Sequence, residues 1–424
     1  MGGAILQSDN IFEVSVASVS LLVSCISYLL IVRKDKSWIN WGTWLFLGSL
    51  ATRYVLPIIY LFMTGSSGGS KYAYSFCYTA YALSSLSAAL VYAYVKPFKL
   101  RSSPSYQAQN PYLGQLAWLM LLLGFLFYLP ILIEFRAYLA EPRRIYELTR
   151  TGYGVYFYTS IFLATLGFAT YLFSNPKTKL GAILFFGLAT ALAYWHGSKG
   201  EIVNYFLIWI LYRVYVDRKR IRALGALSIV GGVGILVIGS FALFLKPTDI
   251  YDLGANLTGY ADIIRNNMVV IDDPHLDLYF GQLMIENEVY SRVPRAVMPG
   301  KPKDYGPFAL GKKYDPAQHR SDKGDPAYDV GLAYADFGPL SMICLCGSSA
   351  FMAWLVSSFA GEMRHRPTPG RFVIFVFLAG VNVIPISGVF LLPETILIAG
   401  VLSIAQRLCI VRGGLSLRHG SSTV

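Results

Sequence analysis

Residues 112–135 read YLGQLAWLMLLLGFLFYLPILIEF, an almost unbroken apolar run that sets the class of the whole chain. A helix needs about 20 apolar residues to cross the hydrocarbon core of a bilayer. Runs of this length recur along the sequence, in which 55% of the 424 residues are hydrophobic and only 14% are charged. A soluble domain has about 25% charged residues. The composition therefore excludes a soluble fold and predicts an all-α polytopic membrane protein.

The apolar runs predict about eleven transmembrane helices, with a range of about ten to twelve. We expect helices 1–8 within 1–245, with a short amphipathic external segment at 136–150. A large, partly helical external loop follows at 246–329, and 330–424 holds helices 9–11 and a cytoplasmic tail. The expected spans are 11–32, 38–62, 72–95, 112–135, 151–173, 179–195, 201–216, 223–245, 330–360, 371–391 and 392–410.

Orientation follows from the short connections, because Lys and Arg gather in those that stay cytoplasmic. One alternating set of connections carries most of these residues, which places the N-terminus and the 246–329 loop outside and the C-terminus inside. The net charge of +12 is therefore mostly topogenic. No zinc finger, basic heptad or RNP-like motif in the sequence indicates a nucleic-acid partner. The basic connections lie at 33–36, 96–101, 177–179, 218–222, 364–371 and 412–418.

Within the external loop, apolar and polar residues at helical spacing predict a helix from about 275 to 291. Asp272 and Asp273 precede Pro274, and with His275 and Asp277 they also suggest a metal site. Aspartate before proline is typical of helix starts, where its side chain caps the first turn. We therefore interpret these aspartates as a cap and predict no metal site.

Several ionisable residues fall at membrane depth, where charge is costly and usually faces a cavity. Arg53 lies in the second span, the stretch WHGSKGEI (195–202) joins the sixth and seventh spans, and Asp336 opens the ninth. The blander interpretation of Glu201 in that stretch is a helix-start cap. All of these positions, together with Arg143, face or approach the external side in the predicted topology.

The external stretch VPRAVMPGKPKDYG (293–306) presents Arg295 and Lys301 between three prolines, which stiffen the backbone. Arginine and lysine suit a diphosphate, and tyrosine rings suit stacking against sugars. The charges therefore favour a site for a lipid-diphosphate-linked saccharide, although a solvated surface loop is the alternative. An enzyme there must stabilise a leaving diphosphate and deprotonate an acceptor hydroxyl.

Three motifs give the chain a resemblance to a known family, the O-antigen polymerases or Wzy-type oligosaccharide repeat-unit polymerases. A lysine stands at 199 where arginine is common. The matching residues are Val293-Pro294-Arg295, Pro299, Lys301-Pro302 and Gly306; Gly197-Ser198-Lys199-Gly200; and Tyr334-Ala335-Asp336-Phe337-Gly338.

The resemblance implies a GT-C-like, inverting, metal-independent membrane glycosyltransferase without a cofactor. It would transfer a growing glycan from undecaprenyl diphosphate to the non-reducing end of a new undecaprenyl-diphosphate-linked repeat unit. The implied location is the bacterial inner membrane, with the long loop and the N-terminus periplasmic. Membrane lipids, a chain-length regulator and a flippase of the same pathway are the further implied partners. An O-antigen ligase and a transporter or flippase of the same lipid-linked sugar remain alternatives.

Candidate site residues follow from both lines of argument. In this family an external Arg is often followed, after ten intervening residues, by a Gly, and this favours Arg143, Arg295 and Arg320. For the general base we rank His319 first, because its ordinary pKa lies near neutrality, then Asp325 and Asp336. Tyr305 and Tyr334 are the candidate sugar contacts. The candidate diphosphate ligands are Arg53, Arg143, Lys199, Arg292, Arg295, Lys301 and Arg320.

Overall fold

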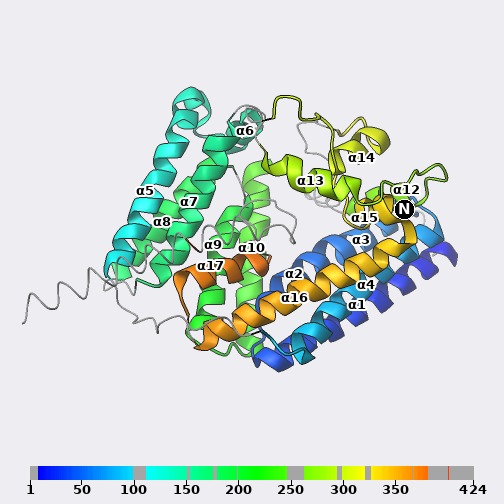
Figure 1. Cartoon of the computed structure of the whole chain (residues 1–424), viewed down its shortest axis with the longest axis horizontal. Helices are drawn as coiled ribbons and strands as arrows, with labels where there is room; N and C mark the ends of the chain where they lie inside the picture. Colours follow the sequence, from blue (N-terminus) through cyan, green and yellow to red (C-terminus); the bar gives the residue numbers. More distant parts are fainter. Residues whose placement is uncertain are drawn as a thin grey trace, which may run out of the picture. The chain divides into compact units, whose positions relative to one another are not determined.

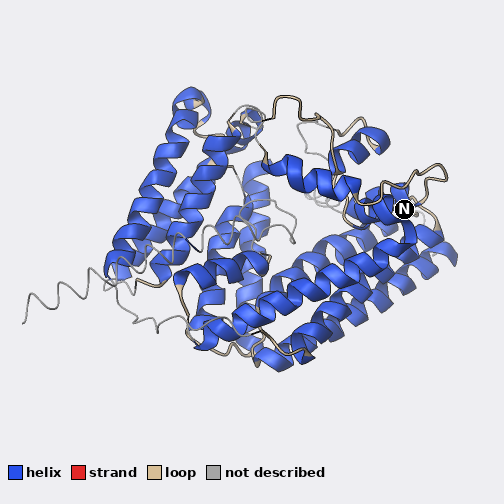
Figure 2. Cartoon of the chain, viewed as in Figure 1, coloured by secondary structure: helices blue, strands red, loops and turns tan. Residues whose placement is uncertain are grey.

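A computed structural model shows helices and loops, and no strand, in the residues that it describes (Figure 2). These residues are 8–98, 111–149, 153–174, 179–197, 199–245, 262–293, 298–319, 326–365, 367–380 and 400. Within them, 6 helices are long and apolar enough to cross a membrane. The prediction of an all-helical polytopic membrane protein is thereby confirmed. The six are Asn10–Asp35, Trp41–Thr64, Lys71–Tyr94, Leu113–Glu134, Gly154–Leu172 and Val330–His365.

Three shorter apolar helices coincide with further expected spans, Leu180–Trp195, Ala223–Ile235 and Pro369–Leu378. The expected span 392–410 lies outside the described residues except for residue 400, and so does most of 371–391.

The chain forms two compact units. The first unit comprises residues 1–36, 41–96 and 247–354. The loop that ends at residue 329, which we call the external loop after its predicted side of the membrane, therefore belongs to the same unit as the first spans. Its helices are α1 (Ser8–Asp35), α2 (Trp41–Ser49), η1 (Leu50–Val55), α3 (Leu56–Thr64), α4 (Lys71–Tyr94), α12 (Asp262–Ile271), α13 (Gln282–Arg292), α14 (Pro307–Tyr314), α15 (Val330–Phe337), η5 (Gly338–Leu340) and the first part of α16 (Ser341–His365).

Helices α1 and α4 run side by side and form the main packing of the first unit (Figure 1). Polar side chains join them to η1. The Tyr54 hydroxyl lies 2.9 Å from Ser20 Oγ and 2.8 Å from Ser24 Oγ, and all three residues are buried. Buried hydroxyls without partners are costly, so these bonds fix the rotation of η1 against α1.

The external loop is attached to the spans of its unit by Asp272, which follows α12. Its carboxylate accepts hydrogen bonds from the backbone N–H and the hydroxyl of Ser70, the N-cap of α4. A Cβ on Gly69 would lie 2.8 Å from Met268 Cβ, so only glycine allows α12 to approach this closely.

The predicted helix 275–291 is wrong at its start, because α13 begins at Gln282. Asp273 does not cap a helix; it accepts the backbone N–H of His275 at 2.8 Å in a turn. The cap comes instead from Asp336, whose carboxylate accepts the backbone N–H groups of Leu283 and Met284. A cap supplied from so far along the chain overrides the local signal.

The second unit comprises residues 37–40, 97–246 and 355–424. Helices α5 and α7 pack closely at Gly124 and Gly167. A Cβ on Gly167 would lie 3.0 Å from the Ala117 carbonyl oxygen, and small residues at such crossings let membrane helices approach. Its helices are α5 (Pro111–Glu134), η2 (Arg136–Tyr138), α6 (Pro142–Leu148), α7 (Gly154–Leu172), α8 (Lys179–Trp195), α9 (Lys199–Leu211), η3 (Tyr212–Val216), α10 (Ala223–Leu245), α17 (Pro369–Leu378) and the last part of α16.

Candidate functional site

Arg53 lies inside the span Trp41–Thr64, on the π-helical turn η1. Such turns inside α-helices are rare and occur frequently at functional sites. Its guanidinium lies 2.9 Å from Asp329 Oδ2 and 4.2 Å above the ring of Tyr81, while its side chain stays 32% exposed. A guanidinium has five N–H donors. Among the described residues, hydrogen bonds to Asp329 and Ser49 use two of them.

The carboxylate of Asp329 is held from three other directions. The Tyr81 hydroxyl donates to Oδ1 at 2.9 Å, the Asn267 amide donates to the same oxygen, and so does the backbone N–H of Val330. Asn267 Oδ1 in turn accepts the Gly331 N–H at 2.9 Å. Sequence reasoning did not select Asp329 or Asn267. Together they fix the position of a guanidinium whose remaining donors can meet an anion.

His319 follows α14 and pairs with Asp304. Its Nε2 lies 3.1 Å from Asp304 Oδ1, and Lys312 Nζ lies 3.0 Å from the other oxygen of that carboxylate. The imidazole is 11% exposed. A carboxylate that orients an imidazole is the usual arrangement for a histidine that moves protons. Of the candidate bases whose surroundings the structure describes, His319 is therefore the better placed to accept a proton.

Lys301 and Tyr305 lie together in the external loop. Lys301 Nζ is 5.0 Å from the centre of the Tyr305 ring and donates to the Val293 carbonyl at 3.2 Å. Tyr305 is buried, and the rings of Tyr290 and Phe308 contact it at centroid distances of 5.4 and 5.2 Å. This ring therefore packs inside the loop, which leaves little of its surface for a sugar.

In the second unit, Arg143 and Lys199 lie on adjoining segments. Arg143 is on α6, with Nε 3.4 Å from Glu147 Oε1, and Lys199 begins α9. Gly197 between α8 and α9 has φ +64°, and a Cβ there would lie 2.4 Å from the Pro142 carbonyl oxygen. Only glycine fits this contact. The turn at Gly197 therefore packs directly against Pro142 at the start of α6.

Beneath this turn, His196 and Glu201 form a buried pair. His196 Nδ1 lies 2.7 Å from Glu201 Oε2, and Nε2 lies 2.9 Å from Ser160 Oγ, which donates to the Gly124 carbonyl. The ring of Tyr128 meets the imidazole edge-on at 4.4 Å. Glu201 therefore does more than start a helix: it ties the first turn of α9 to the end of α8.

Two other candidates are packed within the first unit. Asp336 is 0% exposed and its carboxylate caps α13 through Leu283 and Met284. Tyr334 meets Phe76 edge-on at 5.1 Å, against the buried side chains of α4. Both residues position the external loop on the spans. Asp336 is less suited than His319 to act as a base, because its oxygens already accept two backbone N–H groups and the residue is buried.

For the remaining candidates the structure gives no side-chain positions. Arg295, Arg320 and Asp325 are outside the described residues, and so are the side chains of Lys199 and Arg292.

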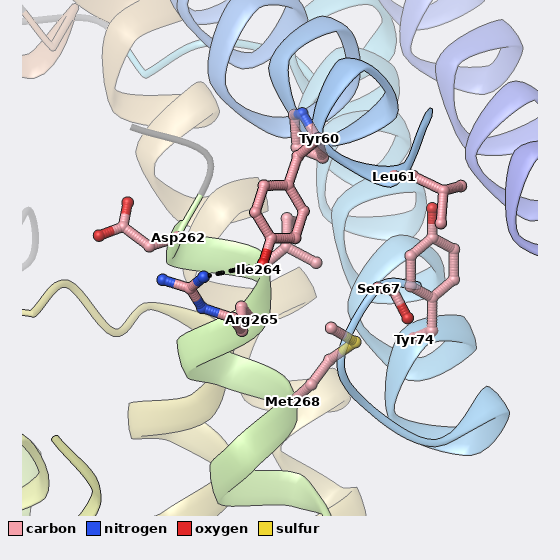
Figure 3. Close-up of a pocket in the computed structure, with 9 residues that line it drawn as sticks. Tyr60, Leu61, Ser67, Tyr74, Asp262, Ile264, Arg265 and Met268 are labelled. Carbon is pink, nitrogen blue, oxygen red and sulfur yellow. Dashed lines mark hydrogen bonds between the residues drawn. The ribbon is translucent and has the colours of Figure 1, made fainter. Parts of the chain in front are cut away.

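A pocket of about 20 Å³ in the first unit lies beside Arg265 on α12 (Figure 3). Arg265 Nη1 donates to the Tyr60 hydroxyl at 3.2 Å, and burial raises the pKa of neighbouring Asp262. This volume suits about one water molecule and not a sugar ring. Its lining residues are Pro57, Tyr60, Leu61, Ser67, Tyr74, Asp262, Ile264, Arg265 and Met268.

Two curated proteins align with almost the whole chain. Both are named "O-antigen polymerase", one from Salmonella typhimurium strain LT2 and the other from Salmonella typhi. Each is 32% identical over 395 residues, which covers 93% of this chain and 95% of the relative. No family model matches the sequence, and no solved structure matches it.

Proposed function

Because the chain belongs to the O-antigen polymerase family, we propose that its external basic residues hold the diphosphate of a lipid-linked glycan. The protein is a glycosyltransferase of a bacterial membrane that polymerises oligosaccharide repeat units.

The proposed donor is the growing glycan on undecaprenyl diphosphate, and the acceptor is the non-reducing end of a new lipid-linked repeat unit. The bond between the anomeric carbon and the diphosphate oxygen breaks, while the acceptor oxygen bonds that carbon from the opposite face, so the configuration inverts. Negative charge grows on the leaving diphosphate, and fixed cations stabilise it. The acceptor proton passes to a base. No metal ion takes part in this scheme.

The observation that carries the diphosphate role is the fixed, partly exposed guanidinium of Arg53. Asp329 and Tyr81 hold it in place before substrate arrives, so little ordering remains for the reaction step. Lys301 and Arg295 of the external loop are the further proposed ligands in the same unit. Arg143 and Lys199, which belong to the second unit, stay predictions from the sequence.

For the base we propose His319, oriented by Asp304. An imidazole exchanges its proton near neutral pH, which suits a base acting on a sugar hydroxyl. The proposed location is the inner membrane, with the N-terminus and the 246–329 loop periplasmic and the C-terminus cytoplasmic, because Lys and Arg gather in the connections that would then be cytoplasmic. The proposed partners are the lipid-linked substrates, the flippase and the chain-length regulator of the pathway.

The test is polymer laddering in cells that lack the native gene and carry Arg53→Ala, Arg53→Lys or Arg295→Ala, with membrane expression confirmed. Lipid-linked intermediates are extracted in parallel. We expect Arg53→Ala to lower polymerisation about 100-fold or more, in the range for loss of one transition-state donor. Arg53→Lys keeps the charge without the planar fork and should retain partial activity.

The matched control is Arg33→Ala, an exposed arginine at the end of α1, which should leave the ladder unchanged. Single repeat units that still reach the surface without long chains would support the proposal. An unchanged ladder in Arg53→Ala would show that Arg53 does not hold the diphosphate. Loss of even single units from the surface would favour a ligase or a flippase.

A further inference from the structure

The second unit contains a cavity of about 810 Å³ that the polymerase proposal does not use. It lies where the end of α7, the start of α8, the end of α9 and η3 meet. Volumes of about 300–1,000 Å³ are typical of sites for small molecules. Its wall is mainly aromatic and aliphatic, and includes Phe168, Tyr171, Phe186, Phe206, Trp209 and Tyr212.

The cavity is open on an apolar side. Ile183 and Phe186 on α8 and Trp209 on α9 line it and are also exposed, with Trp209 at 42%. In a membrane protein, exposed apolar side chains of this kind face hydrocarbon tails rather than water. The cavity therefore offers a lipid chain a place between the helices.

Charged residues lie at one edge of the cavity, and a basic segment follows them. Arg213 and Asp217 line it as an ion pair at 2.5 Å. The backbone N–H of Lys219 donates to the Arg213 carbonyl at 2.9 Å, which holds the following basic segment against this edge. Residues 213–222 contain five basic residues and one acidic residue. Of the basic ones, Arg218, Lys219, Arg220 and Arg222 are exposed.

This basic segment has a fixed course. The backbone N–H of Ile221 donates to Ser37 Oγ at 3.2 Å, and the N–H of Trp38 donates to the Ile221 carbonyl at 3.0 Å. The charges are therefore attached to a tethered backbone beside an apolar cavity. Such a combination matches a molecule with a hydrocarbon tail and an anionic head.

We propose that this cavity binds an anionic phospholipid, with one acyl chain against the aromatic wall and its phosphate at the 213–222 segment. The site is separate from Lys199, which begins the same helix. Lys199 begins α9 and Asp217 follows its continuation η3, so the two ends lie roughly 25 Å apart along the helix at 1.5 Å per residue. The predicted topology places the 213–222 segment on the cytoplasmic side, where anionic lipid attracts Lys and Arg.

Native mass spectrometry of the full-length protein in detergent tests the proposal. The protein is titrated with phosphatidylglycerol, with phosphatidylcholine of the same acyl chains, and with undecaprenyl phosphate. We expect phosphatidylglycerol to bind at lower concentration than phosphatidylcholine. The double variant Lys219→Gln/Arg220→Gln should weaken phosphatidylglycerol binding about ten-fold and leave phosphatidylcholine binding unchanged, because each basic residue near an anionic head contributes a few-fold in affinity.

Ala182→Phe tests the cavity itself, because Ala182 lines it and a phenyl ring would occupy the acyl-chain position. This variant should lower binding of both phospholipids. The charge-matched control is Arg33→Gln/Lys96→Gln, which removes two exposed basic residues from the first unit and should leave binding as in the wild type.

Three results would overturn the proposal. Equal binding of the two phospholipids would show that the protein does not recognise the anionic head group. Unchanged binding in Ala182→Phe would show that the acyl chain does not occupy the cavity. Tighter binding of undecaprenyl phosphate, with displacement of phosphatidylglycerol, would assign the cavity to the carrier lipid instead. Because the readout is lipid binding and not polymerisation, failure here leaves the proposed function untouched.

Discussion

His196 Nδ1 lies 2.7 Å from Glu201 Oε2, and both side chains are buried in the second unit. The Ser160 hydroxyl donates to the Gly124 carbonyl at 2.7 Å and lies 2.9 Å from His196 Nε2. Buried polar groups are costly without hydrogen-bond partners. These contacts therefore hold the end of α8 and the first turn of α9 against α5 and α7.

Loss of the Glu201 carboxylate should destabilise the protein strongly. Glu201→Ala leaves a buried imidazole without its partner, and breaking a buried hydrogen-bonded pair costs about 3 kcal/mol. Glu201→Gln keeps the shape and one hydrogen bond, so it should cost about 1 kcal/mol. Thermal unfolding of the purified variants in detergent measures the difference. A melting temperature of Glu201→Ala equal to that of the wild type would show that the pair contributes nothing to stability.

Arg53 and Asp329 should behave as a coupled pair. Asp329→Asn should destabilise the protein more than Arg53→Gln, because the Asp329 carboxylate also accepts hydrogen bonds from the Tyr81 hydroxyl and the Val330 N–H. In a double-mutant cycle we expect an interaction energy of about 2 kcal/mol, as for residues that share one hydrogen-bond network. The measurement is the free energy of unfolding of both single variants and the double variant. Additive effects would mean that the 2.9 Å contact carries no coupling.

The external loop should show a pH dependence set by Asp273. Hydrogen bonds from Lys313 at 2.8 Å and from Tyr314 at 2.7 Å hold the pKa of the Asp273 carboxyl below its usual value. The same contact with Asp273 raises the pKa of Lys313, and burial is the main cause that raises the pKa of Tyr314 to about 12. The lowered carboxyl pKa stabilises the loop above pH about 4, and this contribution is lost as the pH falls further.

Asp273→Asn should therefore open the loop more easily at pH 7, by about 1 kcal/mol for a partly exposed pair. The difference from the wild type should shrink at pH 3, because the Asp273 carboxyl of the opened loop, at its ordinary pKa of about 4, is then largely protonated. Since the Lys313 contribution is lost only above its ordinary pKa of about 10, the difference should stay flat from about pH 5 to 9. Hydrogen exchange of α14 amides checks this. Asp277→Asn, an exposed carboxylate in the same segment, is the control that should show no such pH-dependent gap.

Local patterns predicted the helices because each apolar run is long enough to decide its own structure. Arg53 was found the same way, since a charge within an apolar run stands out. Its partner Asp329 lies 276 residues away and looks like any polar loop residue, so the pairing could not be predicted. The start of α13 was missed for the same reason: the cap, Asp336, is 52 residues from Met284. Gly197 belongs to a motif that the sequence shows, but glycine is required there because the backbone contacts Pro142 of α6, which the sequence does not show.

That contact predicts that Gly197→Ala displaces α6. The added Cβ would lie 2.4 Å from the Pro142 carbonyl oxygen, and the residue would have to keep φ at +64°. The backbone of α6 must then shift and carry Arg143 with it, so we expect polymerisation to fall at least about ten-fold, since small displacements of positioning groups cost that much or more. Gly187→Ala is the matched control on α8, because its Cβ would meet nothing within 4 Å. Polymer ladders at equal membrane expression compare the two variants. A normal ladder in Gly197→Ala would mean that the contact between Gly197 and Pro142 does not position Arg143.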